Sequence, residues 1–116
     1  MINSRAKGQR GERQIRDLLG QLLDMELRRG DQRNGAREAD LESTDKDKPL
    51  PFAVEVKVGK MPNPRSALSQ LALDCIRRND SRPQLVVIRE DGKNQNDLPR
   101  VWIAMPWESF ERMVKK

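Results

Sequence analysis

Histidine and tyrosine are absent from this chain of 116 residues, and Cys75 is its only cysteine. Without histidine, the Ser-His and Cys-His nucleophile pairs, histidine-based nucleases and the usual Cys/His zinc sites are excluded. Without tyrosine, a tyrosine recombinase is excluded as well. A lone cysteine cannot form an internal disulfide. Any metal site must therefore use oxygen ligands, and a reaction centre made of carboxylates and lysine passes these exclusions.

Long hydrophobic runs are also absent. No apolar stretch approaches the ~20 residues that a membrane-spanning helix needs, and no charged segment followed by an apolar one marks a secretion leader. We therefore expect no membrane association and a cytoplasmic location. The length suits one domain over residues 1–116 with a single core, and residues 1–7, which are polar and basic, are expected to form a flexible arm.

Charge is unevenly distributed along the chain, whose formal net charge is +5. Residues 1–37 contain nine basic and five acidic side chains, residues 38–58 contain three and six, and residues 59–89 contain six and two. An acidic island between basic flanks fits a metal pocket inside a surface that binds a polyanion. The plain alternative is a solvated surface whose charges vary by chance.

The acidic island contains a segment, Phe52 to Val58, in which apolar and charged residues alternate as in a β-strand. The alternation places Glu55 and Lys57 on one face and the valines on the other. Upstream, Asp40 adds a carboxylate to what we interpret as the preceding strand of an antiparallel hairpin, with residues 43–51 as its turn. Two carboxylates and a lysine at one place would form a divalent-metal site with a cationic helper, the minimum needed to hydrolyse a phosphodiester.

A first helix is predicted over about Gly8 to Arg28, because apolar residues recur at three- and four-residue steps. These residues are Ile15, Leu18, Leu19, Leu22, Leu23 and Leu27. Glu12 falls on or beside this stripe, where a carboxylate is costly unless it is paired or binds a cation. The alternative for Glu12 is an exposed first turn, in which an acid favours the helix dipole.

The remaining segments complete an α/β pattern. Residues 30–37 should form a loop or a short edge strand, and residues 59–65, with two prolines, a loop beside the site. A second helix should begin at about Ser66 and end near Asn79. Its predicted apolar face consists of Leu68, Leu71, Ala72, Cys75 and Ile76.

The C-terminal part predicts two strands and a helix. Residues 85–88 and 101–104 are apolar blocks typical of buried strands, and the first should follow the second helix in a right-handed parallel crossover. Pro106 then opens a short helix. The predicted fold is α/β, with a mixed β-sheet, the order α-β-β-β-α-β-β-α and helices packed on the sheet.

The ordered set of Glu12, Asp40, Glu55 and Lys57 resembles that of the PD-(D/E)XK nuclease superfamily. The chain is most similar to the small Holliday junction resolvases of archaea and their resolvase-like relatives in phages and prophages. The similarity covers about residues 7–89, and its matched positions are Lys7, Gly8, Glu12, Arg13, Gly35, Asp40, Glu55 and Lys57. Two departures are Ala39, where the family most often has proline, and the long charged loop before residue 52. The second leaves Glu38, Asp40 and Glu42 as candidates for the metal, with Asp40 chosen by position.

The resemblance implies a restriction-endonuclease-like domain and a Mg²⁺-dependent DNA endonuclease in which Mn²⁺ can substitute. The metal would bind Asp40, Glu55 and the backbone carbonyl of Val56, and Glu12 would complete the shell directly or through water. Lys57 would orient the attacking water or neutralise charge on the phosphate. The implied substrate is branched or four-way junction DNA in a bacterial or phage-infected cell. Because cutting both strands needs two sites, the resemblance also implies a homodimer.

Basic residues around the acidic island are expected to contact the DNA backbone, because guanidinium groups pair well with phosphate oxygens. The expected set is Arg5, Lys7, Arg10, Arg13, Arg33, Arg37, Lys60 and Arg65. Gln70 lies off the stripe of the second helix and faces either the pocket or solvent. The candidates for a dimer interface are Trp102, Trp107, Phe110 and Met113.

Two other functions are compatible with the sequence. One is a DNA-binding or regulatory phage protein that keeps the nuclease fold without catalysis, since one fold hosts many functions. The other is a small interaction protein whose charges only solubilise it. The full acid-acid-lysine set argues against the first, and the second predicts no affinity for nucleic acid.

Overall fold

The computed structural model describes residues 4–31, 38–60, 62–90 and 100–115, and for residues 4–7 it describes the backbone alone. Three helices and five strands follow one another in the succession that the sequence predicts. They are α1 (Ser4–Leu23), β1 (Leu27–Arg29), β2 (Leu41–Ser43), β3 (Ala53–Gly59), α2 (Pro64–Arg77), β4 (Gln84–Glu90), β5 (Arg100–Ala104) and α3 (Trp107–Val114). The predicted α/β class is confirmed.

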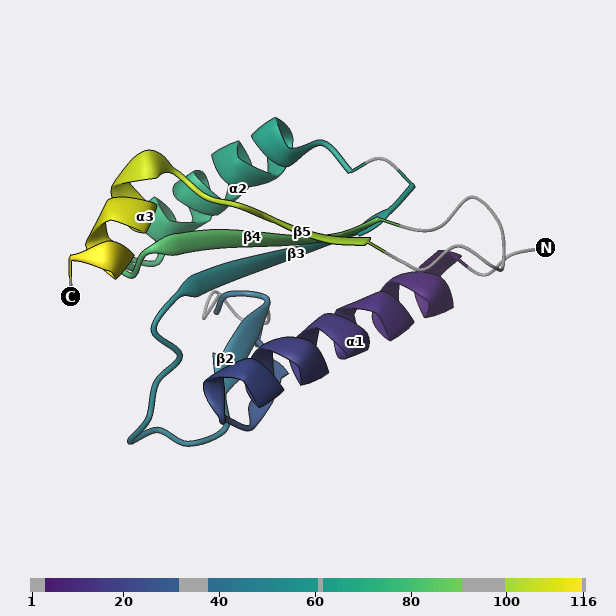
Figure 1. The fold of residues 1–116 in the computed structure, drawn as a ribbon, viewed down its shortest axis with the longest axis horizontal. Coiled ribbons are helices and arrows are strands. Elements are labelled where there is room, and N and C mark those ends of the chain that lie inside the picture. Colours follow the sequence, from purple (N-terminus) through teal and green to yellow (C-terminus); the bar gives the residue numbers. More distant parts are fainter. Residues whose placement is uncertain (1–3, 32–37, 61, 91–99, 116) are drawn as a thin grey trace.

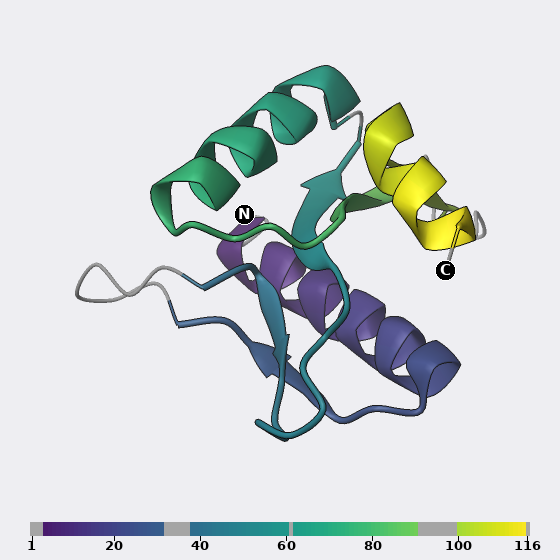
Figure 2. The same cartoon turned by 90° about the vertical axis from the view of Figure 1, so that its left-hand side faces the viewer.

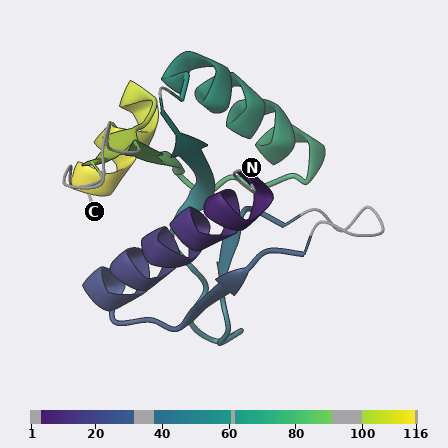
Figure 3. The same ribbon diagram turned by 90° about the vertical axis from the view of Figure 1, so that its right-hand side faces the viewer.

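The five strands form one mixed sheet in the order β1-β2-β3-β4-β5. Only β3 and β4 are parallel, and α2 connects them, as the predicted crossover requires; the other three pairs are antiparallel. In Figure 1, α1 lies on one side of the sheet, and α2 and α3 lie on the other. Figure 3 shows α1 running obliquely across its face. The sheet is therefore a middle layer between helices.

Strand β3 separates two apolar clusters, because its side chains alternate between the two faces. Toward α1, Val54 and Val56 belong to a cluster that also contains Ile15, Leu27, Leu41, Leu50, Leu85 and Val87. Toward α2, Ala53 belongs to a cluster with Ala67, Leu71, Cys75, Val86 and Ile88. The predicted alternation in β3 is confirmed, and it directs Glu55 and Lys57 to the α2 side.

The predicted limits of the first helix are wrong at both ends. Helix α1 begins at Ser4, so the backbone of residues 4–7 is helical and the predicted arm can include only residues 1–3, which lie outside the described part. It ends at Leu23, because the N–H of Met25 donates to the carbonyl of Gly20 at 2.9 Å and Asp24 adopts a left-handed φ of 53°. This is a Schellman ending, which Asp tolerates.

Several predicted core positions are exposed. Leu18 and Leu22 of α1 and Ile76 of α2 face solvent, whereas Ile15 is buried. The buried stripe of α1 follows four-residue steps through Gly11, which lies so close to Val58 that a Cβ there would be 2.6 Å from a methyl carbon. The stripe of helix residues that contacts the sheet is therefore narrower than predicted, because the sheet covers only one side of each helix.

Strand β5 is not the buried strand that its apolar sequence predicts. It is the last strand in the sheet order, and Val101, Trp102 and Ile103 are 45%, 50% and 65% exposed. The rings of Trp107 and Phe110 on α3 contact each other at 5.7 Å between centroids and are also exposed. Figure 2 shows α3 beside α2, away from α1. Exposed apolar side chains therefore lie on both faces of β5 and on α3.

Among the described residues, no helix is both long enough and apolar enough to span a bilayer. Cys75 is buried and carries a free thiol.

Candidate metal-binding site

The hairpin between β2 and β3 brings Asp40 to Glu55. Leu41 of β2 pairs with Val54 of β3 in antiparallel register, and Asp40, the residue before Leu41, lies close enough to Glu55 for the two carboxyl groups to interact. Asp40 lies just before the strand in which the sequence predicts it, but its N–H donates to the carbonyl of Val54 at 3.1 Å. Its carboxylate Oδ2 accepts the N–H of Val56 at 2.8 Å. Backbone hydrogen bonds thus hold both ends of Asp40 against β3.

Glu55 and Lys57 occupy the face of β3 that contacts α2. The Glu55 residue is only 9% exposed, and its Oε1 lies 3.3 Å from the Lys57 ammonium. The two side chains share a face because they are two residues apart in a strand. The structure therefore brings three of the four predicted site residues, Asp40, Glu55 and Lys57, to one place.

For the carboxyl groups of Asp40 and Glu55, the cost of burial exceeds the stabilisation that their hydrogen bonds and the Lys57 charge provide. Burial raises the pKa of Asp40 above its ordinary value, and the Val56 N–H, the Lys57 charge and the Glu55 carboxyl oppose the increase. Burial and the charge of Asp40 raise the pKa of Glu55 to about 7, against the attraction of Lys57. Within the described chain no arginine forms a salt bridge with either group. Two adjacent buried carboxylates that lack such a partner favour binding of a proton or a cation.

The backbone of Val56 adds a further oxygen. Its N–H points toward Asp40, and the N–H and C=O of one residue in an extended strand point to the same edge. The pairing of β2 with β3 ends at Leu41, so the Val56 carbonyl faces the edge beside Asp40. Two carboxylates and a carbonyl are the hard oxygen ligands that Mg²⁺ and Mn²⁺ accept. The donor set therefore fits the predicted metal.

Glu12 is not brought into this group. Its Oε2 lies 4.0 Å from Nε of Arg29, on the β1 side of the sheet. Glu12, Arg13, Arg16, Arg29 and Leu41 line a cavity of about 260 Å³. Within residues 4–31, 38–60, 62–90 and 100–115, no three carboxylate or thiol side chains gather closely enough to form a metal cluster. The charge of Arg29 also opposes the rise in the pKa of Asp40, so this arginine interacts with both acids.

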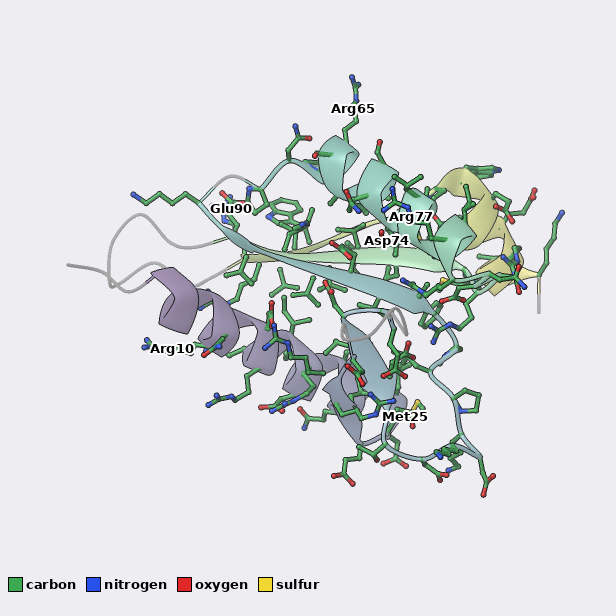
Figure 4. The ribbon with its side chains drawn as sticks, turned by 180° about the vertical axis from the view of Figure 1, so that it is seen from behind. Arg10, Met25, Arg65, Asp74, Arg77 and Glu90 are labelled. Atoms are coloured by element: carbon green, nitrogen blue, oxygen red, sulfur yellow. The ribbon has the colours of Figure 1, made fainter. Side chains whose placement is uncertain are left out.

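Asp74 of α2 is a nearby acid that sequence reasoning missed. Its negative charge contributes to the raised pKa of Glu55, and its side chain is only 20% exposed. Gln70 Nε2 donates to Asp74 Oδ1 at 3.0 Å, and Arg77 lies 3.9 Å from the same oxygen. Figure 4 shows Asp74 and Arg77 on the part of α2 that lies over the sheet. In the sequence Asp74 lies between Leu71 and Cys75, at the edge of the buried stripe of the helix, and this position could have indicated an acid close to the sheet.

The structure distinguishes Asp40 from its two acidic neighbours. Glu38 forms a two-pronged pair with Arg28, at 2.7 and 2.8 Å, and the pKa of Glu38 falls to about 2. Glu42 forms a similar pair with Arg82, at 2.8 and 3.0 Å. Both outer acids therefore have arginine partners, and Asp40 is the one left beside Glu55.

The expected DNA contacts are scattered over the surface. Arg10, Arg13, Lys60 and Arg65 are exposed. Figure 4 shows Arg10 on α1 and Arg65 on α2 extending away from opposite sides of the sheet. The side chains of Arg5 and Lys7, and all of Arg33, Gly35 and Arg37, lie outside what the structure describes.

No family model matches the chain, and no match is found among curated proteins or solved structures. The class shown is therefore the one that the coordinates define, a mixed five-stranded sheet with three helices. Membership of the PD-(D/E)XK superfamily stays a prediction.

Proposed function

We propose that this protein is a metal-dependent DNA endonuclease that hydrolyses phosphodiester bonds and selects DNA by its structure, as a Holliday junction resolvase does. The observation that carries this proposal is the buried Asp40–Glu55 pair, which lacks an arginine partner in the described chain and has Lys57 3.3 Å from Glu55. A structural carboxylate pair would normally be neutralised by such a partner. A site that binds a metal cation would instead keep its carboxylates free of an arginine partner.

The Asp40 and Glu55 carboxylates and the Val56 carbonyl would hold Mg²⁺, or Mn²⁺ in its place. When bound, such an ion acts as a Lewis acid on a phosphoryl oxygen and lowers the pKa of a water. Asp40 is already oriented for this role because the Val56 N–H fixes one of its oxygens. Glu12, paired with Arg29, is assigned a place outside the direct ligands.

Lys57 would stabilise negative charge that develops on the phosphate. Its ammonium is ion-paired with Glu55, and an ammonium group has no lone pair with which to accept a proton. We therefore assign Lys57 to charge stabilisation or to orientation of the attacking water, and not to proton abstraction.

A homodimer belongs to the proposal, because a four-way junction needs two cuts and the described part of the chain offers one such site. The exposed apolar residues are concentrated on β5 and α3, at the end of the chain. They include Val101, Trp102, Ile103, Trp107, Phe110, Met113 and Val114. We propose that this surface forms the contact between two copies, since patches of this kind mark association sites.

The test is a panel of four-way, flap, nicked and linear duplex DNA, each incubated with Mg²⁺, Mn²⁺ or chelator. We expect metal-dependent cutting, fastest on branched substrates. Asp40→Asn and Glu55→Gln should bind the same DNA without cutting it, whereas Glu38→Gln, which removes a neighbouring acid that has its own arginine, should still cut. Equal cutting by wild type and the two site variants would show that the site is elsewhere. Binding without cutting of any substrate would favour the non-catalytic DNA-binding alternative.

A further inference from the structure

Arg82, in the connection between α2 and β4, uses all five of its N–H donors. Nε and one terminal nitrogen contact the Asp80 carboxylate at 3.0 and 2.7 Å. The two terminal nitrogens reach both oxygens of Glu42, and the fifth donor bonds to the Leu50 carbonyl at 3.1 Å. The Arg82 side chain is 25% exposed, and those of Glu42 and Asp80 are 13% and 9% exposed. A guanidinium with all its donors used thus links residues 80–82 to Glu42 and Leu50, which precede Arg82 by 40 and 32 residues.

This network reaches the candidate site through Glu42. Oε2 of Glu42 accepts the N–H of Ala39 at 3.1 Å. Ala39 is 2% exposed and directly precedes Asp40. Glu42 therefore closes a tight loop around Asp40, from the residue before it to the second residue after it, and Arg82 fixes the position of that loop.

We propose that Arg82 and Glu42 are positioning residues for Asp40: they hold the backbone on both sides of this carboxylate so that it stays against β3 and beside Glu55. The proposal rests on the proposed function for its catalytic consequence. The placement of Asp40 itself can be measured without DNA or metal, because Asp40 Oδ2 accepts the Val56 N–H.

A second arginine–glutamate pair in the same part of the sheet provides a matched control. Arg28 binds Glu38 with the same two-pronged geometry, but the Arg28 side chain is 42% exposed. Glu38 accepts the N–H of Asp31 and not that of a residue adjoining Asp40. A general loss of surface charge or of one ion pair should affect both pairs alike, whereas positioning of Asp40 should depend on Arg82 and Glu42.

The experiment compares Arg82→Lys and Glu42→Gln with Arg28→Lys by amide NMR and hydrogen exchange on the full chain without metal. Lysine keeps the charge of Arg82 but cannot bridge Glu42, Asp80 and Leu50 at once. We expect the Ala39 and Val56 amide resonances to shift and to lose exchange protection in the first two variants. In Arg28→Lys both amides should remain as in the wild type.

Activity gives a second readout. If the wild type cuts DNA, Arg82→Lys should lower kcat by roughly ten- to a hundredfold, the usual effect of losing a group that orients a metal ligand, with DNA affinity in chelator unchanged. A variant that only weakens the fold would lower the melting temperature, and it would not combine a lower kcat with an unchanged DNA affinity.

The proposal is wrong if Ala39 and Val56 keep wild-type shifts and protection in both variants, or if Arg28→Lys perturbs them equally. Should Arg82→Lys not fold, the milder Glu42→Gln decides, because glutamine has one acceptor oxygen in place of two and cannot serve Ala39 and both terminal nitrogens of Arg82 as Glu42 does. If the wild type cuts no DNA, the proposed function fails, while the amide measurements still show whether Arg82 and Glu42 position Asp40.

Discussion

Two sets of carboxylates in this protein differ in their electrostatic surroundings, and their pKa values are shifted in opposite directions. Asp80 and Glu38 are paired with arginines, and the pKa of each is lowered to about 2. Asp40 and Glu55 have no arginine in a salt bridge within the described chain, and the pKa of each is raised. Burial opposes ionisation in all four, so the arginines account for the difference. The comparison separates acids that pair with arginines from acids that have no arginine salt bridge within the described chain.

The two sets of carboxylates also differ in where they lie in the fold. Asp80 lies in a connection between elements and ties Arg78 and Arg82 together. Asp40 and Glu55 lie on adjacent segments at the middle of the sheet, where β2 stops pairing with β3. Burial of this carboxylate pair, which has Lys57 but no arginine in a salt bridge within the described chain, reduces stability, and the proposed function would account for that cost.

The largest expected effect concerns the chemistry. Asp40→Asn or Glu55→Gln should reduce metal-dependent cutting by more than about a hundredfold, because even residues that only orient a ligand contribute about ten- to a hundredfold. Neither variant should lower the melting temperature, because each removes a repelled charge. Single-turnover cutting and thermal unfolding of the same samples measure both effects. A strong loss of stability in either variant would mean that the pair supports the fold.

The next effect concerns the arginine-paired acids. Arg82→Met leaves Glu42 and Asp80 without their main partner, so we expect a loss of about 3 kcal/mol in the free energy of unfolding, as for other buried ion pairs that lose one member. Arg28→Met should cost less than about 1 kcal/mol, because that pair is more exposed. Denaturant titration measures both, and equal losses would contradict the distinction between the two pairs.

The pH dependence of stability provides a third test. Because the folded pKa of Glu55, about 7, exceeds its ordinary value of 4.5, the folded protein holds a proton over this range that the unfolded chain releases. Stability in chelator should therefore fall as pH rises from about 4.5 to about 7, by up to about 3 kcal/mol. Glu55→Gln should remove this dependence, and added Mg²⁺ should reduce it in the wild type. A flat profile in the wild type would show that Glu55 is compensated.

The smallest effect concerns Asp74. Its charge helps to raise the pKa of Glu55, so Asp74→Asn should lower the pH at which Glu55 titrates. The asparagine can still accept the hydrogen bond from Gln70. A carboxyl-detected NMR titration of Glu55 measures the shift, with Glu108→Gln on the exposed face of α3 as the matched loss of one charge. An equal shift in both variants would indicate a general charge effect.

The local patterns predicted much of the fold. The alternation in residues 52–58 and the apolar block at 85–88 predicted the two central strands. Endings and edges were predicted less well. Leu27 continues the spacing of α1 but lies in β1, because left-handed Asp24 ends the helix first. The apolar residues of β5 suggested a buried strand, yet no local signal tells a central strand from an edge.

The sequence by itself determined that Glu55 and Lys57 share a face, because the two-residue period of a strand is a local property. Only the tertiary structure decided that Asp40, and not Glu38 or Glu42, stands beside Glu55 with no arginine salt bridge among the described residues. The partners of the other two acids, Arg28 and Arg82, come from 10 and 40 residues away. Pairing over such separations depends on how the segments pack against one another, so it cannot be predicted from the spacing of residues along the chain.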